Sequence, residues 1–67
     1  SLSLRGDLFK NALDLSSGGK FNLALQEWNQ NHDSYPDDAA GFSNRGNVRL
    51  VMGDVEGSID DQNKAIN

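Results

Sequence analysis

The sequence contains no cysteine, only one proline and only one histidine among its 67 residues. Without cysteine the chain has neither a disulfide framework nor a thiolate metal site, so two common ways of stabilising a small domain are absent. Such a chain is compatible with a reducing compartment. A single domain of this size buries only about 60% of the surface that its unfolded form exposes. We therefore expect a marginal core that depends on some other source of stability.

Groups that carry chemistry are equally scarce. His32 is the only histidine, so neither a Cys-His pair nor a multi-histidine metal site can form within the chain. The acidic pairs at 37–38 and 60–61 lack the spacing of a calcium loop. Residues 18–20, Gly-Gly-Lys, lack the upstream glycine and the following Ser or Thr of a phosphate loop. We therefore expect no catalytic activity, no metal site and no cofactor.

Basic residues and long apolar runs are also few. Six Lys and Arg stand against ten Asp and Glu, and the net charge of −4 argues against a nucleic-acid partner. No apolar run is long enough for direct membrane insertion. The opening residues 1–5 lack the apolar run and cleavage pattern of a secretory signal. We expect a soluble protein, and the sequence does not indicate its cellular compartment.

Helical periodicity, in contrast, is plentiful. Apolar residues recur at three- and four-residue spacings through four stretches, and no two-residue strand period appears. Glycines at 18–19 and 53 divide the stretches into pairs, because glycine adopts the positive φ that a tight helix end requires. Pro36 disfavours helix in the residue before it and separates the two pairs. The pattern predicts an all-α protein of two helical hairpins, with helices at about residues 7–17, 20–33, 39–52 and 55–67.

Several side chains have expected places in these hairpins. Trp28 follows Ala24 and Leu25 at helical spacing, which predicts that its ring lies in the core of the first helix pair. An aspartate at 37–38 and Asp54 are expected to cap the helices that follow them. These assignments give the capping aspartates a structural role.

The last helix has an apolar side formed by Val55, Ile59 and Ile66. Three charged residues lie off this stripe and are predicted to form a solvated face: Asp60, Asp61 and Lys64. His32, near the end of its own helix, is expected to interact with the terminal carbonyls or with solvent. The helical pattern is unbroken at Ile66, so we expect this sequence to be part of a longer protein.

The two hairpins repeat with a period of 34 residues. Gly19 and Gly53 are 34 apart, and at this offset large residues match large ones and small residues match small ones. The matched pairs are Leu8 with Phe42, Ala12 with Gly46, Phe21 with Val55, Ala24 with Ser58, and Leu25 with Ile59. Small residues at paired positions are what a close approach of two helices requires.

This pattern resembles the tetratricopeptide repeat family. That family has a large residue, then Leu-Gly, then Tyr, then Ala and Phe four residues apart, and finally Pro. In the first copy these places hold Leu8, Asn11-Ala12, Leu15, Ala24, Trp28 and Pro36. In the second copy they hold Phe42, Arg45-Gly46, Arg49, Ser58 and Gln62. The resemblance covers nearly the whole chain.

The departures from the family pattern are polar. Asn11 and Arg45 stand where the family prefers Leu, Arg49 where it prefers Tyr, and Gln62 where it prefers a large apolar residue. Arg45 and Arg49 share one helix face, so they are candidates for structural ion pairs with a neighbouring helix or for contacts with a partner. The Arg-Gly and Gly-Asp style of the second copy is similar to repeats of cyanobacterial and plastid proteins in this family.

The resemblance implies a fragment of a right-handed α-solenoid, in which antiparallel helix pairs stack on one another. Its parts are a lead-in at residues 1–4, a first repeat at 5–38 and a truncated second repeat at 39–67. Two repeats are fewer than the usual minimum of about three. We therefore expect further repeats, a capping helix of the same chain, or a partner to complete the fold.

In this family the first helix of each pair lines a concave groove, and the resemblance assigns ten residues to it. They are Phe9, Lys10, Leu13, Ser16, Ser17, Ser43, Asn44, Asn47, Leu50 and Val51. A clamp for a terminal carboxylate is not expected, because Phe9 and Leu13 occupy places where it needs Lys and Asn. Apolar anchors beside amide groups favour an extended peptide segment with apolar and polar side chains.

The function implied is that of a non-catalytic protein–protein interaction module, an adaptor or assembly scaffold that binds a protein or peptide partner in this groove. The alternative is a structural helical element that packs permanently within a larger multi-subunit assembly, or that regulates an attached domain. Helicity of the isolated chain distinguishes the two, because an obligate component of an assembly folds poorly alone.

Overall fold

The computed structural model describes residues 4–66. They form four helices joined by short turns: α1 (Leu4–Ser17), α2 (Phe21–Ser34), α3 (Ala39–Val51) and α4 (Val55–Ile66). No strand occurs among these residues, so the predicted all-α class is confirmed. Of the predicted lead-in, residues 1–3 lie outside the described residues and Leu4 already belongs to α1.

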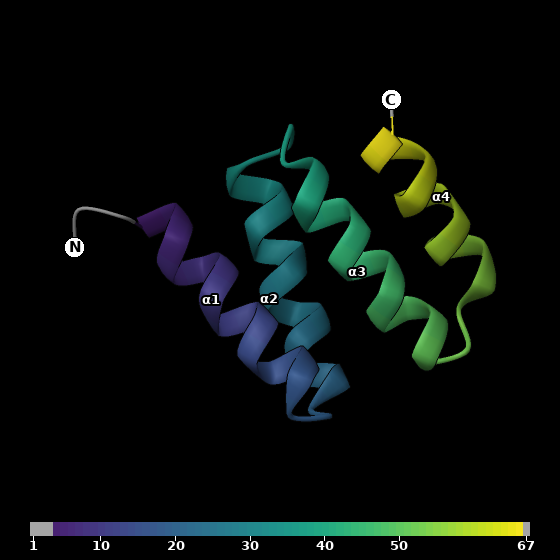
Figure 1. The fold of residues 1–67 in the computed structure, drawn as a ribbon, viewed down its shortest axis with the longest axis horizontal. Helices are drawn as coiled ribbons and strands as arrows, with labels where there is room; N and C mark the ends of the chain where they lie inside the picture. Colours follow the sequence, from purple (N-terminus) through teal and green to yellow (C-terminus); the bar gives the residue numbers. More distant parts are fainter. Residues whose placement is uncertain (1–3, 67) are drawn as a thin grey trace.

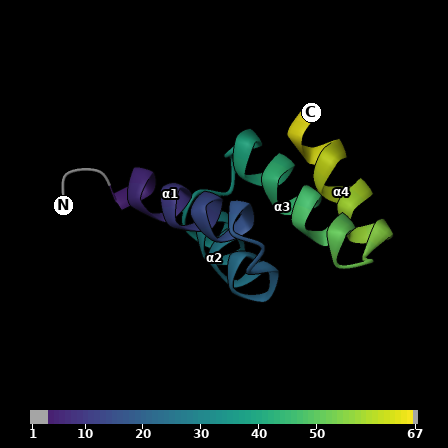
Figure 2. The ribbon, with the colours of Figure 1, turned by 60° about the horizontal axis from the view of Figure 1, so that its bottom comes forward.

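The helices form two hairpins that lie side by side (Figure 1). α1 packs against α2, α3 packs against α4, and α2 joins the hairpins by packing against α3, while α1 touches α3 more lightly. Consequently α1 and α4 stand at opposite ends of the molecule. Figure 2 gives the same order from a second direction.

Both hairpin turns are built by the glycines that the sequence singles out. Gly19 has a φ of 76° and Gly53 a φ of 90°, values that residues with a side chain rarely adopt. The amide after each glycine, that of Lys20 or Asp54, donates to a carbonyl five residues back at 2.9 Å and 2.8 Å. These are Schellman helix ends. Every hydrogen bond of the first turn recurs 34 residues later in the second.

Trp28 lies at the centre of the core, with 1% of its surface exposed, which confirms its predicted place. It packs with Ala12, Ala24 and Val48. The Phe9 ring meets it edge to face, with 5.1 Å between the ring centroids. The indole nitrogen donates to the Ser16 hydroxyl at 2.9 Å, so the polar edge of the ring is satisfied inside the hairpin.

The predicted small residues do permit close helix packing. Ala12 and Ala24 are fully buried, and Gly46 and Ser58 are buried at the matching places of the second hairpin. A Cβ added to Gly46 would lie 2.7 Å from Nε2 of Gln62 and 3.2 Å from Cβ of Asp61. α3 and α4 therefore pack closely at Gly46, where a larger residue would require the end of the Gln62 side chain to move and would crowd Asp61.

The prediction that Asp61 lies on a solvated face is wrong, because its side chain is fully buried between α3 and α4. Arg45 donates to it twice, from Nε at 2.9 Å and Nη2 at 2.8 Å. Arg49 donates a third bond from Nη1 at 2.9 Å. The remaining amino group of Arg45 reaches back to Oδ1 of Asn29 in α2 at 3.0 Å. This network of two arginines around one carboxylate occupies the middle of the second hairpin.

Because α4 turns Asp61 toward α3, its apolar stripe is exposed. Ser58 and Asp61 are the buried residues of that helix, three positions apart. Val55, Ile59 and Ile66 lie on the other side and are exposed. A buried carboxylate is stable there only because two arginines from α3 neutralise it and satisfy its oxygens.

The predicted caps have different outcomes. Asp54 accepts a hydrogen bond from the backbone amide of Gly57 at 3.0 Å, as an N-cap does. Asp38 precedes α3, but its side chain makes no cap hydrogen bond. It accepts from Nδ2 of Asn31 at 2.9 Å instead. The capping prediction is therefore confirmed for Asp54 and wrong for Asp38, whose carboxylate ties α2 to the start of α3.

His32 meets its expectation only in part, because the residue is half-buried. Its ring packs against Phe42 of α3, with 4.8 Å between the ring centroids. Nδ1 is buried and has no hydrogen-bond partner within residues 4–66, so this side of the ring meets neither a terminal carbonyl nor solvent. The histidine thus contributes to the contact between the hairpins.

Candidate functional site

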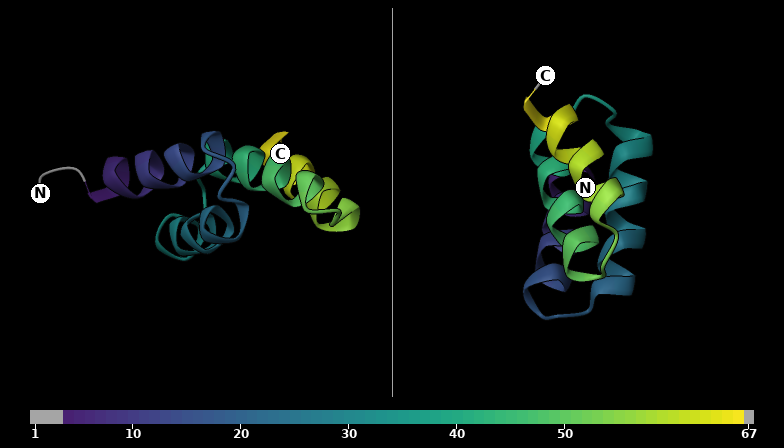
Figure 3. Two further views of the ribbon diagram at one scale, coloured as in Figure 1. Left: turned by 90° about the horizontal axis from the view of Figure 1, so that it is seen from below. Right: turned by 90° about the vertical axis from the view of Figure 1, so that its right-hand side faces the viewer.

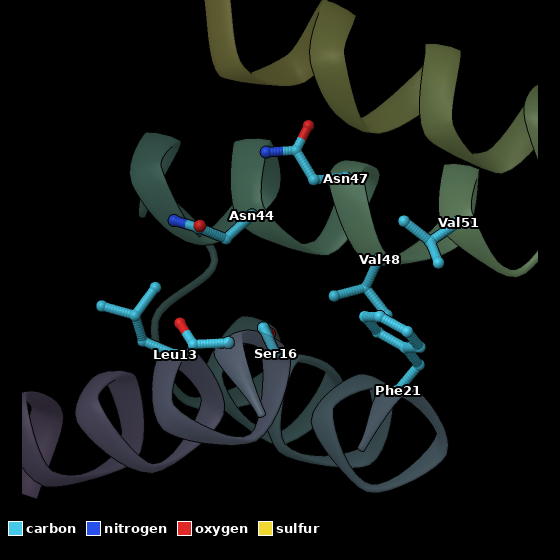
Figure 4. Close-up of a pocket in the computed structure, with 8 residues that line it drawn as sticks. Leu13, Ser16, Phe21, Asn44, Asn47, Val48 and Val51 are labelled. Atoms are coloured by element: carbon cyan, nitrogen blue, oxygen red, sulfur yellow. The ribbon is translucent and has the colours of Figure 1, made fainter. Parts of the chain in front are cut away.

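A shallow pocket of about 250 Å³ opens between the two hairpins. Eight residues from three helices line it: Leu13, Ser16, Ser17, Phe21, Asn44, Asn47, Val48 and Val51. Figure 4 shows Leu13 and Ser16 on α1 facing α3, and Val48 facing the Phe21 ring. We call this pocket the groove.

Six of the ten residues assigned to the groove by resemblance line it: Leu13, Ser16, Ser17, Asn44, Asn47 and Val51. The other four are elsewhere. Phe9 packs on Trp28, and Leu50 is exposed without lining the groove. The backbone carbonyl of Ser43 accepts a hydrogen bond from Gln62 in α4 at 3.1 Å.

Lys10 is the only charged residue among the ten, and it points to a neighbour on its own helix. Its ammonium group lies 2.9 Å from Oδ2 of Asp14, one turn along α1. The hydrogen bond with Asp14, together with the charge of that carboxylate, raises the pKa of Lys10. The groove lining itself therefore contains no charged side chain.

Two lining residues, Phe21 and Val48, are not among those ten, and the sequence placed Phe21 only at a helix-packing position. Val48 follows Asn44 by four positions and precedes Val51 by three, which is the spacing of a single helix face. That spacing was a usable signal. Phe21 is the first residue of α2, and it reaches the groove because the hairpin turn places that end of α2 beside α3.

The two asparagines of the groove have amide groups whose orientation is set by backbone carbonyls. Asn44 must present its nitrogen to the carbonyl of Ala40, at 2.8 Å, because a carbonyl only accepts. Gln62 likewise presents its nitrogen to the carbonyl of Ser43, and its second N–H meets Oδ1 of Asn47 at 3.2 Å. Oδ1 of Asn44 and Nδ2 of Asn47 are therefore left over, one acceptor and one donor.

Figure 4 shows the resulting arrangement on α3. The oxygen of Asn47 points toward α4, and its nitrogen points back along α3 toward Asn44. Neither the Asn44 oxygen nor the Asn47 nitrogen makes a hydrogen bond within residues 4–66. The groove thus offers one fixed acceptor and one fixed donor beside apolar walls.

Arg45 and Arg49 do not line the groove. All three nitrogens of the Arg45 guanidinium are used, two on Asp61 and one on Asn29. Arg49 pairs with Asp61, and its Nε lies 3.8 Å from a carboxylate oxygen of Asp54. Of the two roles open to these residues, the ion pairs are the ones that the described side chains form.

The groove offers few side chains that could take part in catalysis. Its lining consists of Leu, Ser, Phe, Asn and Val side chains, none of which titrates near neutral pH. Within residues 4–66, no three His, Asp or Glu side chains gather closely enough to hold a metal ion. The four helices of the described residues are also too short and too polar for any of them to cross a membrane.

Comparison with known proteins gives no relative: no family model, no curated protein and no solved structure matches the chain.

Proposed function

We propose that this chain is a non-catalytic protein–protein interaction module, an adaptor or assembly scaffold that binds an extended segment of a partner in the groove. The observation that carries the proposal is the pair of amides on α3, in which Oδ1 of Asn44 and Nδ2 of Asn47 remain available beside apolar walls. The argument rests on the hydrogen-bonding needs of a peptide backbone.

Every peptide unit of an extended segment carries one N–H donor and one C=O acceptor. Asn44 and Asn47 are three positions apart on α3, so their side chains are neighbours on its surface. The Asn44 oxygen can accept from a backbone N–H, and the Asn47 nitrogen can donate to a backbone C=O. Together they can satisfy the N–H and the C=O of one residue, because these two groups point to the same side of an extended segment, and they do so whatever side chain the residue carries, which suits recognition of a segment by its backbone.

The apolar lining supplies the remaining affinity. Leu13 and Val51 are exposed at the edge of the groove, and Phe21 and Val48 form its floor. Since the lining carries no charge, a charged partner side chain would lose water there and gain no counter-charge. The partner segment is therefore uncharged where it enters the groove, with aliphatic side chains beside Leu13 and Val51.

We also propose that the chain is built from tetratricopeptide repeats and is part of a right-handed solenoid. The support is the recurrence of the turn hydrogen bonds and of the positive-φ glycine at an offset of 34 residues. The contact of α3 with both helices of the first hairpin is the packing that stacked repeats require.

Peptide selection on the immobilised 67-residue chain tests the groove proposal, using a library of uncharged peptides with capped ends. A selected peptide is then titrated against Asn44→Ala and Asn47→Ala, and each variant is expected to bind at least about fivefold more weakly, since each loses a hydrogen bond worth about 1 kcal/mol. Asn22→Ala, on the exposed surface of α2, is the matched control and keeps the original affinity. Equal binding by all three variants would place the peptide outside the groove.

The alternative, a permanent structural role in a larger assembly, is favoured by one observation. Val55, Ile59 and Ile66 expose an apolar stripe along α4. Thermal unfolding of the isolated chain, followed by far-UV circular dichroism, separates the two proposals. A cooperative transition with high helicity supports the binding module, whereas low helicity supports an obligate component of an assembly.

A further inference from the structure

The exposed side of α4 is a second surface, separate from the groove. Val55, Ile59 and Ile66 lie on one side of the helix at spacings of four and seven residues. Ile59 is 54% exposed and Ile66 is 82% exposed. α4 packs only against α3, and Figure 3 shows it at the end of the molecule with no described helix beyond it. We call this surface the outer face of α4.

The matching surface of the first hairpin is covered by α3. Thirty-four residues before Val55, Ile59 and Ile66 stand Phe21, Leu25 and His32. Phe21 and Leu25 pack against the core to which α3 contributes Val48, and the His32 ring lies against Phe42 of α3. In the first hairpin, therefore, a single helix, α3, covers the surface of α2 that corresponds to the outer face of α4.

A polar contact of that interface also has a counterpart on α4. In the first hairpin, Oδ1 of Asn29 accepts a hydrogen bond from Nη1 of Arg45 at 3.0 Å. The residue 34 positions later is again an asparagine, Asn63, which is exposed. Its side chain makes no hydrogen bond within residues 4–66. Asn63 thus offers a side-chain acceptor at the position where Asn29 of α2 accepts the hydrogen bond from Arg45.

The two charged residues that border the apolar stripe are both acidic, whereas Lys64 lies farther round the helix. Glu56 and Asp60 are exposed on α4 and lie on one line with Asn63, at spacings of four and three residues. This line runs beside the apolar stripe. A helix that meets both would bring apolar residues to Ile59 and basic residues to the acidic line, which gives electrostatic complementarity.

A second copy of the chain does not supply such a helix by stacking end to end. α3 meets α2 through Gly41, Arg45 and Val48, and the residues 34 positions earlier on α1 are Asp7, Asn11 and Asp14. These side chains are polar and exposed. They would set carboxylates, one of them paired with Lys10, against an apolar stripe with an acidic border, so α1 is a poor cover for α4.

We propose that the outer face of α4 binds a basic amphipathic helix of a partner protein, which lies on α4 as α3 lies on α2. The aliphatic residues of the partner helix cover Val55, Ile59 and Ile66. An arginine at its border donates to Oδ1 of Asn63 and lies near Asp60. This surface shares no residue with the groove, so the inference does not depend on peptide binding there.

The probe is a fluorescein-labelled helical peptide of alanine, leucine and arginine, with the leucines on one face and the arginines beside them. A second peptide carries glutamate in place of every arginine. Fluorescence anisotropy is expected to show binding of the basic peptide to the 67-residue chain and at least about tenfold weaker binding of the acidic one.

The matched variants are Ile59→Ser on α4 and Leu23→Ser on α2, since Leu23 is also an exposed aliphatic residue, at 50%. Ile59→Ser is expected to weaken binding of the basic peptide about tenfold, and Leu23→Ser to leave it unchanged. Val55→Ser serves as the second variant if circular dichroism shows that Ile59→Ser alters the fold.

Three results would overturn the proposal. Absence of binding by the basic peptide would exclude the docking surface. Equal binding to wild type and to both serine variants on α4 would mean that only the net charge of −4 attracts the peptide. Self-association of the chain in sedimentation equilibrium that Ile59→Ser abolishes would identify a second copy as the occupant.

Discussion

Replacing Asp61 by asparagine tests how much of the second hairpin depends on its buried carboxylate. The substitution preserves the size of the side chain and removes its charge. Three hydrogen bonds from Arg45 and Arg49 now end on this group, at 2.8 to 2.9 Å. Asparagine keeps one oxygen acceptor, but its amino group faces arginine donors, and a buried guanidinium loses its counter-charge.

Removing one partner of a buried ion pair costs about 3–5 kcal/mol. Since Arg49 is partly exposed and asparagine retains one acceptor, we expect Asp61→Asn to fall at the lower end, about 3 kcal/mol. A chain of this size has a free energy of unfolding of about 3–10 kcal/mol. With a urea dependence of about 1–3 kcal/mol per molar, the unfolding midpoint should drop by about 1 M or more.

Two signals measured on the same urea titration locate the effect. Trp28 fluorescence reports on the core of the first hairpin, whereas far-UV circular dichroism reports on all four helices. In Asp61→Asn we expect helicity to be lost at lower urea than the fluorescence changes, because the second hairpin unfolds first. In the wild type the two transitions should coincide more closely.

Asp60→Asn is the matched control, since this neighbouring aspartate is exposed and its substitution should change stability by less than about 0.5 kcal/mol. The reasoning is refuted if Asp61→Asn is as stable as Asp60→Asn. It is also refuted if the double variant Arg45→Met with Asp61→Leu is less stable than Asp61→Asn, because the apolar pair removes the buried Arg45 guanidinium together with its carboxylate, while the partly exposed Arg49 keeps Asp54 nearby.

Two further substitutions test the second hairpin turn and the buried hydrogen bond of Trp28. Gly53→Ala should lower stability by about 1–2 kcal/mol in thermal unfolding, because residue 53 has a φ of 90° while a Cβ there meets nothing within 4 Å, so the cost is that of the backbone alone. A variant as stable as wild type would contradict the Schellman turn. Ser16→Ala should cost about 1–3 kcal/mol by leaving Nε1 of Trp28 without its acceptor. Ser17→Ala, the exposed neighbour, is its control, and equal melting of the two would contradict the buried hydrogen bond.

Local patterns were sufficient to predict the helices, the glycine turns and the place of Trp28. Each depends on residues within one or two helical turns: the apolar spacing around Ala24 and Trp28, and the positive φ that Gly19 and Gly53 adopt. The Asp54 cap is local in the same sense, since its acceptor serves an amide three residues later.

The burial of Asp61 could not be predicted in this way. By itself a carboxylate beside Asp60 and Gln62 is a surface residue, and only the arrival of Arg45, sixteen residues away, makes an interior place favourable. The groove shows the same division. The helical spacing of Val48 from Asn44 and Val51 indicates its place, whereas the packing of α1 on α2 decides that Phe9 meets Trp28 instead of lining the groove. Phe21 packs against the core as expected and also lines the groove.

The arginine network has a geometric consequence for the groove. Apolar contacts between two helices keep much of their strength when one helix slides, whereas hydrogen bonds of 2.8 to 2.9 Å from Arg45 and Arg49 to Asp61 do not. A slip of α4 by one turn, about 5.4 Å, would break all three at once. It would also withdraw Gln62 from Asn47. The longitudinal register of α4 along α3 therefore sets the direction in which the Asn47 amide points.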